Sequence, residues 1–245
     1  MSSKKTKKKT STQKKIIHQV YGMFDDGIPL KDIPVFYENV KKTRAFCKKN
    51  NIQHKLWNLK QANNLIQKHF QQYTQLWNDF KVPIQKADFI RYCILYKYGG
   101  IYIDCDIHPI DKSNTHINKL FQKDFFFVTW DDDKKFKPYN AVLGTKKNNP
   151  LYEDILKHCQ ESFYEKSKND IYKKWKGRYI FHTTGHYMLL RVLKKNNVYN
   201  KKYILNIMKV YHSKSNRIIQ GSNPIFEDSN ASTWFEGKDI SKKNN

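Results

Sequence analysis

The sequence contains no long apolar run, few cysteines and few acidic residues. None of its apolar runs approaches the roughly 20 residues that a membrane-spanning helix requires, and its first residues lack the apolar core of a secretory signal peptide. The four cysteines form no C-x-x-C pair and no Cys/His cluster: Cys47, Cys93, Cys105 and Cys159. These absences argue against a disulfide framework and a zinc site. We expect a reduced, intracellular protein that has no transmembrane segment and is not secreted.

Basic residues outnumber acidic ones. The 245 residues include 46 Lys and Arg against 22 Asp and Glu, which gives a formal net charge of +24. Such a surface attracts polyanions or anionic small molecules. Residues 1–15 are basic and of low complexity, so we expect a disordered tail there. One interpretation is a polyanion- or nucleic-acid-binding protein. No binding platform of basic and aromatic residues is recognisable, however, and nucleic acid is the less favoured partner.

The apolar residues alternate between strand-like and helix-like spacing. In the first part of the chain they predict a strand, a helix, a strand and a helix, at Ile16–Tyr21, Val35–Lys49, Gln53–Trp57 and Ala62–Tyr73. This order predicts an α/β fold with a mostly parallel sheet covered by helices. Because we find neither an internal repeat nor a linker, we predict one domain over residues 16–236 and a C-terminal tail at 237–245.

The last third of the chain carries turn signals. Thr183, Thr184 and Gly185 mark a turn before a short helix, and Gly221–Gly237 is rich in turn residues around buried-type aromatic side chains. Aromatic residues inside a polar loop indicate that the loop folds over something. We therefore expect a functional loop near the C-terminus.

The most informative stretch is Lys86–Asp106, KADFIRYCILYKYGGIYIDCD. It predicts a helix, a turn at Gly99–Gly100 and a short buried strand that leads to Asp104 and Asp106. In an extended strand these two carboxylates would point to the same side, because successive side chains alternate. Two carboxylates at a strand end can hold a hard divalent cation through oxygen. In open α/β sheets, ligands bind at this edge.

A second polar pair lies on the preceding helix. Asp88 and Arg91 are three residues apart and therefore lie on one side of a helix that is otherwise apolar. This placement indicates the inner edge of a cleft. Asp-x-Asp alone is also typical of a solvated turn, and the apolar strand before it is what favours a ligand site.

The whole stretch resembles the signature of glycosyltransferase family 32. The likeness includes the helical Asp-Arg pair, the Gly-Gly turn, the strand and Asp-x-Asp. Four other features stand in family order: IIHQVYG at the start, NAVLG, the T-G before residue 186 and a C-terminal tryptophan. The family includes yeast-type initiating mannosyltransferases and bacterial capsule transferases, and is related to clostridial glucosylating toxins. The resemblance covers about residues 16–235. It implies a single GT-A domain, an α/β nucleotide-sugar-binding sheet flanked by helices, and a retaining transfer of sugar.

The resemblance also implies a metal site. A divalent cation, Mn²⁺ or Mg²⁺, would bridge the two phosphates of the donor and stabilise charge on the leaving group. Asp106 corresponds to the direct metal ligand, and Asp104 to the residue that touches the ribose and the metal shell. The family's final loop often carries a metal-binding histidine, which this chain lacks. In its place we nominate Ser232 and Asp228.

The remaining implied roles concern the nucleotide-sugar, a UDP- or GDP-sugar. Asp88 and Arg91 would orient the sugar hydroxyls, and Asn140 would help to shape the sugar pocket. Tyr21 stands where the family usually has tryptophan, and would stack on the base. Trp234 would donate a hydrogen bond to phosphate. The acceptor would be a hydroxyl of a glycan, a lipid or a protein. A cytoplasmic enzyme of a bacterium or of a virus-infected host cell fits these expectations.

One enzymatic alternative uses the same two aspartates. Haloacid-dehalogenase-type phosphatases also carry Asp-x-Asp after an apolar strand, and the first aspartate attacks phosphorus. Thr or Val is common two residues further on, whereas this chain has His108. The pattern therefore favours the transferase.

Overall fold

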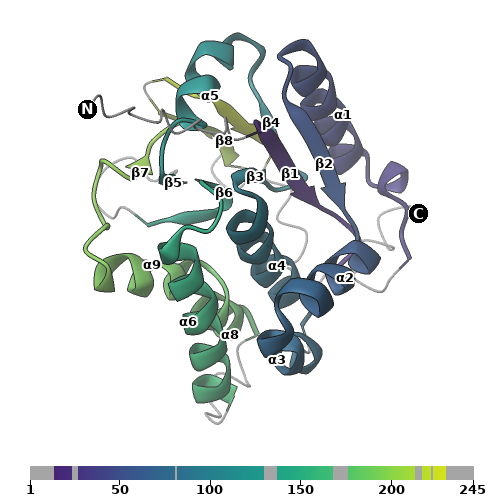
Figure 1. Cartoon of the computed structure of the whole chain (residues 1–245). Helices are drawn as coiled ribbons and strands as arrows, with labels where there is room; N and C mark the ends of the chain where they lie inside the picture. Colours follow the sequence, from purple (N-terminus) through teal and green to yellow (C-terminus); the bar gives the residue numbers. More distant parts are fainter. Residues whose placement is uncertain are drawn as a thin grey trace, which may run out of the picture.

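A six-stranded sheet forms the centre of the molecule (Figure 1). The computed structural model describes residues 14–23, 27–80, 82–129, 137–167, 176–212, 217–221 and 223–229. Within them the strand order is β2-β1-β3-β6-β5-β7. The strands are β1 (Ile16–Val20), β2 (Gln53–Trp57), β3 (Gly100–Ile103), β5 (Phe125–Val128), β6 (Tyr139–Thr145) and β7 (Ile204–Leu205). Strand β6 runs antiparallel to β3 and β5, and the other neighbouring strands pair in parallel. The prediction of a mostly parallel sheet is confirmed, with β6 reversed.

Helices cover both faces of this sheet. The α-helices are α1 (Pro34–Lys49), α2 (Leu59–His69), α3 (Thr74–Asp79), α4 (Pro83–Tyr98), α5 (Asn114–Leu120), α6 (Pro150–Ser167), α8 (Lys176–Thr183) and α9 (His186–Lys195). Short 3-10 turns lie at Leu30–Asp32, Gln71–Tyr73 and Asp111–Ser113. The predicted class, α/β with a central sheet flanked by helices, is confirmed. In the part of the chain that the structure describes, no helix combines the length and the apolarity needed to cross a membrane.

Alternation along the strands divides the interior into two cores. Tyr102 and Phe127 belong to a cluster with buried residues of α2, α3, α4, α6 and α9. Ile101, Ile103 and Phe126 point to the opposite face, where they join residues of α1 and α5. Successive strand residues face opposite sides, so each buried strand contributes to both cores. The sheet is therefore the middle layer of three.

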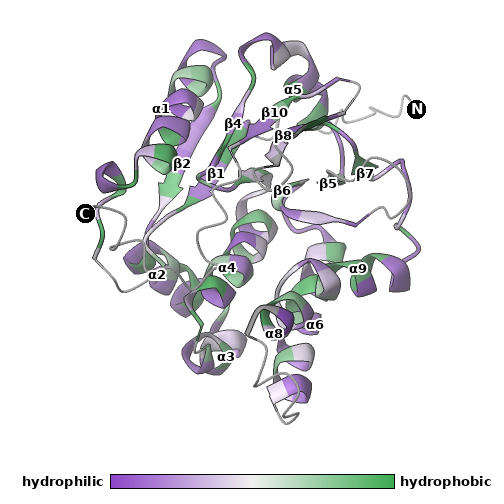
Figure 2. Ribbon diagram, turned by 180° about the vertical axis from the view of Figure 1, so that it is seen from behind, coloured by the Kyte–Doolittle hydropathy of each residue, from purple (hydrophilic) through white to green (hydrophobic). Residues whose placement is uncertain are grey.

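A second, smaller sheet lies in the layer of α1 and α5 (Figure 2). Its order is β4-β10-β8-β9, with β4 (Ile107–Pro109), β8 (Met208–His212), β9 (Arg217–Gln220) and β10 (Phe226–Asp228). Part of the segment expected to be a turn-rich loop is thus strand β10, because Phe226 is completely buried in the core beneath the sheet. The pairing sets Asp228 opposite Ile107, directly after the two aspartates of the central motif.

Helix α4 passes directly into the strand that carries the motif. Gly99 and Gly100 have φ angles of +68° and +96°, which favour glycine. A Cβ atom on Gly100 would lie 2.5 Å from the Ile16 carbonyl oxygen. The two glycines therefore allow the chain to reverse and to approach β1 closely. Residues 1–13 of the predicted tail and the whole of 237–245 lie outside the described residues.

Candidate functional site

Asp104 and Asp106 lie in a turn at the carboxyl end of β3. The Asp104 amide donates to the Ala141 carbonyl at 2.9 Å, and the Ile107 amide donates to the Asp104 carbonyl at 3.1 Å. Residues 105 and 106 form the turn between β3 and β4. The expectation of an extended strand through Asp106 is wrong, because the chain must leave the central sheet here to enter the second one. Strand alternation therefore does not set the relative direction of the two carboxylates.

Arg91 connects helix α4 with this turn. Its side chain is 3% exposed. Arg91 Nη2 lies 2.9 Å from Asp88 Oδ1, and Nη1 lies 3.2 Å from Asp104 Oδ1. Nη1 also donates to the Asn140 carbonyl at 2.7 Å. A buried arginine needs such partners because an unpaired charge in the interior costs several kcal/mol. The structure thus brings together four of the residues nominated from the sequence.

Asp88 is the most enclosed acidic group of this network. Besides Arg91, its carboxylate accepts a hydrogen bond from Asn140 Nδ2 at 2.9 Å and one from Thr184 Oγ1 at 3.0 Å. Burial raises the pKa of Asp88 to about 6, against the opposing effects of Arg91, Thr184 and Asn140. Two carboxylates share one guanidinium, which explains why pairing does not cancel the cost of burial. At neutral pH Asp88 is ionised.

Thr184 was not recognised as part of the site from the sequence. It was interpreted as a turn residue, but it is completely buried between α8 and α9, where its hydroxyl meets Asp88. Its carbonyl accepts a hydrogen bond from Tyr92 Oη at 2.9 Å. Two adjacent threonines inside an apolar segment were the available signal, since a buried hydroxyl requires a partner.

Asp104 is the more accessible of the two carboxylates that Arg91 pairs. Its side chain is 31% exposed. Tyr102 Oη donates to Asp104 Oδ1 at 2.6 Å, the same oxygen that faces Arg91. Burial raises the pKa of Asp104, and Arg91 opposes this effect. Tyr102 and Arg91 hold one oxygen in place while part of the carboxylate faces solvent, as a ligand-binding group requires.

The second sheet brings Asp228 to the same place. Tyr139 Oη donates to Asp228 Oδ2 at 2.9 Å, and the Ser229 amide donates to the Asp106 carbonyl at 3.0 Å. Burial raises the pKa of Tyr139 well above its usual range, and the negative charges of Asp228, Asp106 and Asp104 add to the effect. Asp228 therefore contacts the phenol directly, and the charges of Asp104 and Asp106 act on it. Tyr139, which precedes Asn140, was not nominated from the sequence.

The donor atoms fit a hard cation in kind. Among the described residues, no three His, Cys, Asp or Glu side chains are arranged so that they could hold a metal ion by themselves. Mg²⁺ usually takes one or two carboxylates, with substrate phosphates and water completing its shell. Asp104 and Asp106 can supply such oxygens. Ser232 and Trp234, also nominated, lie outside the described residues.

Tyr21 lies at the same edge of the sheet. It follows β1, whose parallel register with β3 pairs His18 with Tyr102 and so places Tyr21 level with the Asp-x-Asp turn. Cys105 Sγ in that turn donates to the Val20 carbonyl at 3.3 Å. The Tyr21 hydroxyl donates to the Ile28 carbonyl at 2.8 Å, and its ring meets Phe36 edge-on with the centroids 6.3 Å apart. The half-buried ring therefore borders the candidate site.

Comparison with known proteins agrees with this arrangement. Residues 4–127, just over half of the chain, match the family described as "Glycosyltransferase sugar-binding region containing DXD motif". The chain belongs to this family. The resemblance inferred from the Asp-x-Asp stretch is thereby confirmed, and Asp104-Cys105-Asp106 is its DXD motif.

Several curated proteins and solved structures also resemble the chain. It is 31% identical over 145 residues to the glycosyltransferase L373 of Acanthamoeba polyphaga mimivirus, covering 58% of this chain and 54% of that protein. It is 37% identical over 168 residues to the mannosyl phosphorylinositol ceramide synthase SUR1 of Saccharomyces cerevisiae, covering 58% and 41%. The chain thus spans about half the length of these relatives, or less. The PaToxG glycosyltransferase structure superposes with a TM-score of 0.48 at 16% identity, covering 75% of this chain and 70% of that one.

Proposed function

We propose that the protein is a metal-dependent, retaining glycosyltransferase that moves a sugar from a UDP- or GDP-sugar to a hydroxyl acceptor. The observation that carries the proposal is the buried network of Asp88, Arg91, Asn140 and Asp104 beside the DXD turn. Membership of the DXD glycosyltransferase family supports the reaction class. The acceptor is a glycan, a lipid or a protein, and the name of the yeast relative favours a lipid that carries a sugar-like head group.

The network would hold the donor sugar in a fixed orientation. Asp88 and Asn140 are linked to each other and to Arg91, so none of the three side chains can rotate without breaking a hydrogen bond. Asp104, whose side chain is 31% exposed, is the carboxylate of this network that a sugar hydroxyl can reach. The buried Asp88 and Arg91 would orient the sugar by fixing Asp104 and Asn140 in place. A site that is rigid before the donor binds does not lose side-chain freedom on binding.

The diphosphate would lie on the other side of Asp104, toward Asp106. Mn²⁺ or Mg²⁺, held by Asp104 and Asp106 with Asp228 nearby, would neutralise the charge that develops on the leaving diphosphate. Tyr21 would stack against the base at the same sheet edge. Ser232 and Trp234 keep their proposed roles as metal and phosphate contacts.

Retention would occur on the front face of the sugar. The acceptor oxygen would bond to the anomeric carbon from the side on which the bond to phosphate breaks, and its proton would pass to the departing phosphate oxygen. Asp88 is unsuited to attack the anomeric carbon, because it is 4% exposed and accepts from three donors. A nucleophile needs a lone pair directed at the reacting atom.

Donor hydrolysis provides the test. A panel of UDP- and GDP-sugars with Mn²⁺ is screened for hydrolysis and for thermal stabilisation of the full chain. We expect one donor to be hydrolysed, and Asp106→Asn to lower the rate by about 100-fold or more. Asp111→Asn is the matched control, because this nearby carboxylate is exposed. The proposal fails if no nucleotide-sugar binds, or if Asp106→Asn behaves like the control.

The net charge of +24 favours one second candidate, polyanion binding. Binding of this kind weakens steeply with salt. Deletion of residues 1–15 would then abolish the protein's activity while Asp106→Ala left it intact, which is the reverse of the result expected for a transferase.

A further inference from the structure

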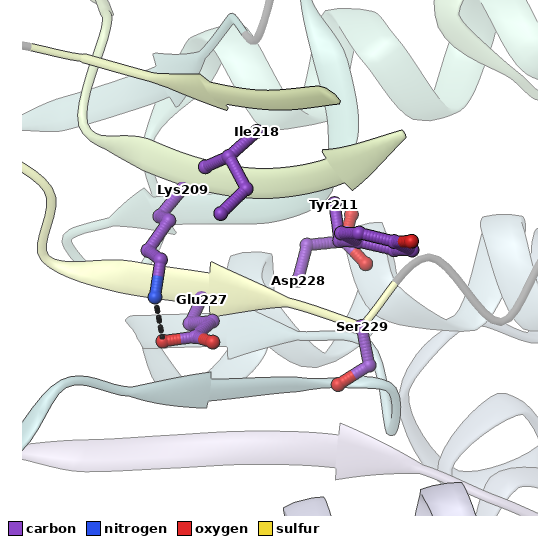
Figure 3. A pocket seen from close by; sticks show the side chains of 6 residues that line it. All are labelled: Lys209, Tyr211, Ile218, Glu227, Asp228 and Ser229. Carbon is purple, nitrogen blue, oxygen red and sulfur yellow. Dashed lines mark hydrogen bonds and ion pairs between the residues drawn. The ribbon is translucent and has the colours of Figure 1, made fainter. Parts of the chain in front are cut away.

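A pocket of about 290 Å³ lies on the outer face of the second sheet (Figure 3). It is lined by Lys209, Tyr211, Ile218, Glu227, Asp228 and Ser229. Met208, Val210 and Phe226 alternate with Lys209, Tyr211 and Glu227 and point into the core. Because side chains alternate along a strand, burying one face of β8 and β10 leaves the other face to form the pocket.

Apolar and polar walls face each other in this pocket. Tyr211 and Ile218 are paired across β8 and β9, and they are 45% and 59% exposed. Between β8 and the neighbouring β10, Lys209 Nζ lies 3.1 Å from Glu227 Oε2, as Figure 3 shows. A tyrosine ring offers an apolar face together with a polar hydroxyl. Carboxylate, ammonium and hydroxyl groups supply both acceptors and donors. This combination suits a ring that carries hydroxyl groups on its edge and C–H groups on its face.

The charges of the pocket select against anions. Lys209 is the one cation among the six lining residues, and Glu227 compensates it. Asp228, which is 1% exposed and accepts a hydrogen bond from Tyr139, adds no positive charge. A phosphate would therefore find no uncompensated positive charge there, in spite of the basic character of the whole chain. The pocket favours an uncharged polyhydroxyl ligand.

Ser229 joins the pocket to the DXD turn. It lines the pocket, and its amide donates to the Asp106 carbonyl at 3.0 Å. Its hydroxyl accepts from Asn39 Nδ2 at 3.1 Å, and Asn39 Oδ1 in turn accepts from His108 Nδ1 at 2.6 Å, which fixes this end of the pocket. A ligand in the pocket would thus be held next to the motif that we assign to the donor diphosphate.

From these observations we infer that the pocket formed by β8, β9 and β10 is the acceptor subsite, and that it binds a neutral sugar or cyclic polyol. The inference rests on the proposed transferase function. Tyr211 and Ile218 provide the surface for the ring face, and Glu227 and Lys209 bind its hydroxyls.

The test separates acceptor binding from donor chemistry. In the full chain, hydrolysis of the donor found in the panel is measured first, and then transfer to methyl glycosides of neutral hexoses and to myo-inositol. Tyr211→Ala should raise the KM for the acceptor by about tenfold and leave donor hydrolysis unchanged. Tyr98→Ala is the matched control, because this tyrosine is 39% exposed and lies at the end of α4 where β3 begins, at the opposite end of β3 from the DXD turn.

Glu227→Gln tests the charge argument. It leaves Lys209 uncompensated, so the ratio of transfer to a hexose phosphate over the neutral glycoside should rise by about two- to fivefold. The subsite is refuted if Tyr211→Ala matches Tyr98→Ala, or if the native chain prefers the hexose phosphate. Absence of donor hydrolysis in the native chain would instead refute the transferase function itself.

Discussion

Replacing Thr184 with valine tests whether the Asp88 environment controls the ionisation of the site. Thr184 Oγ1 donates to Asp88 Oδ2 at 3.0 Å, and valine keeps the shape of threonine but removes the donor. Thr183 is the matched control. It is also completely buried, but its hydroxyl accepts from Gln85 Nε2 at 2.9 Å and donates to the Tyr179 carbonyl at 2.8 Å, which are both neutral groups.

The sign of the pH dependence follows from the pKa of Asp88. Burial raises this pKa from 3.8 to about 6 in the folded protein. The stability that the group contributes is therefore present at low pH and is lost as pH rises through the folded pKa. A difference of about two pH units corresponds to about 3 kcal/mol of unfolding free energy, lost between about pH 4 and pH 6.

Thr184→Val should extend this loss to higher pH. A hydrogen bond to a charged group contributes about 1.5–3 kcal/mol, so its removal should raise the Asp88 pKa by a further one to two pH units, to about 7–8. The added destabilisation should be small at about pH 4, where Asp88 is protonated, and reach about 1.5–3 kcal/mol at about pH 8. Thr183→Val should lose the same free energy at every pH.

Urea unfolding of the native chain and both variants, followed by tryptophan fluorescence across this pH range, provides the measurement. Asp88→Asn should remove the pH dependence that distinguishes the two threonine variants. If the curve for Thr184→Val runs parallel to that for Thr183→Val, Thr184 does not stabilise an ionised Asp88 and the reasoning is refuted.

Three further predictions concern stability. His18 is buried and has its pKa lowered to about 3, so its contribution to stability, present above about pH 6.5, should fall by about 1.4 kcal/mol per pH unit on acidification. Asp88 acts in the opposite direction below about pH 6, so the native chain is compared with His18→Gln by urea unfolding, and a difference that stays constant down to about pH 5 would contradict this. Gly100→Ala should cost more than about 2 kcal/mol in the same assay, because its φ is +96° and its Cβ would strike Ile16. Gly22→Ala, with φ +69° and nothing within 4 Å, should cost only about 1 kcal/mol, and equal losses would refute the steric argument. Arg91→Met should cost about 3–5 kcal/mol at neutral pH and less at about pH 4, where Asp88 is protonated; a pH-independent loss would show that charge pairing is not its role.

Local sequence features predicted the first half of the fold well. Strand β2 has the bounds expected from its pattern, and β1 ends one residue earlier than expected, at Val20. Helix α4, the glycine turn and β3 follow one another as predicted, since each depends on interactions within a few residues. The pairing of Asp88 with Arg91 is of the same kind, because residues three apart meet on any helix.

The second sheet and its effect on the site were not predictable in this way. Strand β10 is three residues long, and its pairing with β4 depends on burying Phe226. Such a strand has too few positions to display alternation. The turn after β3 was not predictable for the same reason. It forms because the chain leaves the central sheet at Asp104 to enter the second sheet, whose pairing is not visible in the local pattern.

The sequence by itself determined the α/β class, the DXD motif and the family to which the chain belongs. Only the tertiary structure decided that Asp228 lies beside Asp106, that Thr184 donates to Asp88, and that Arg91 is shared by two carboxylates. The Thr184 contact joins residues 96 positions apart in the chain. Contacts of this kind form only when buried faces of separate elements pack together, and the local pattern of a segment does not specify its distant partner.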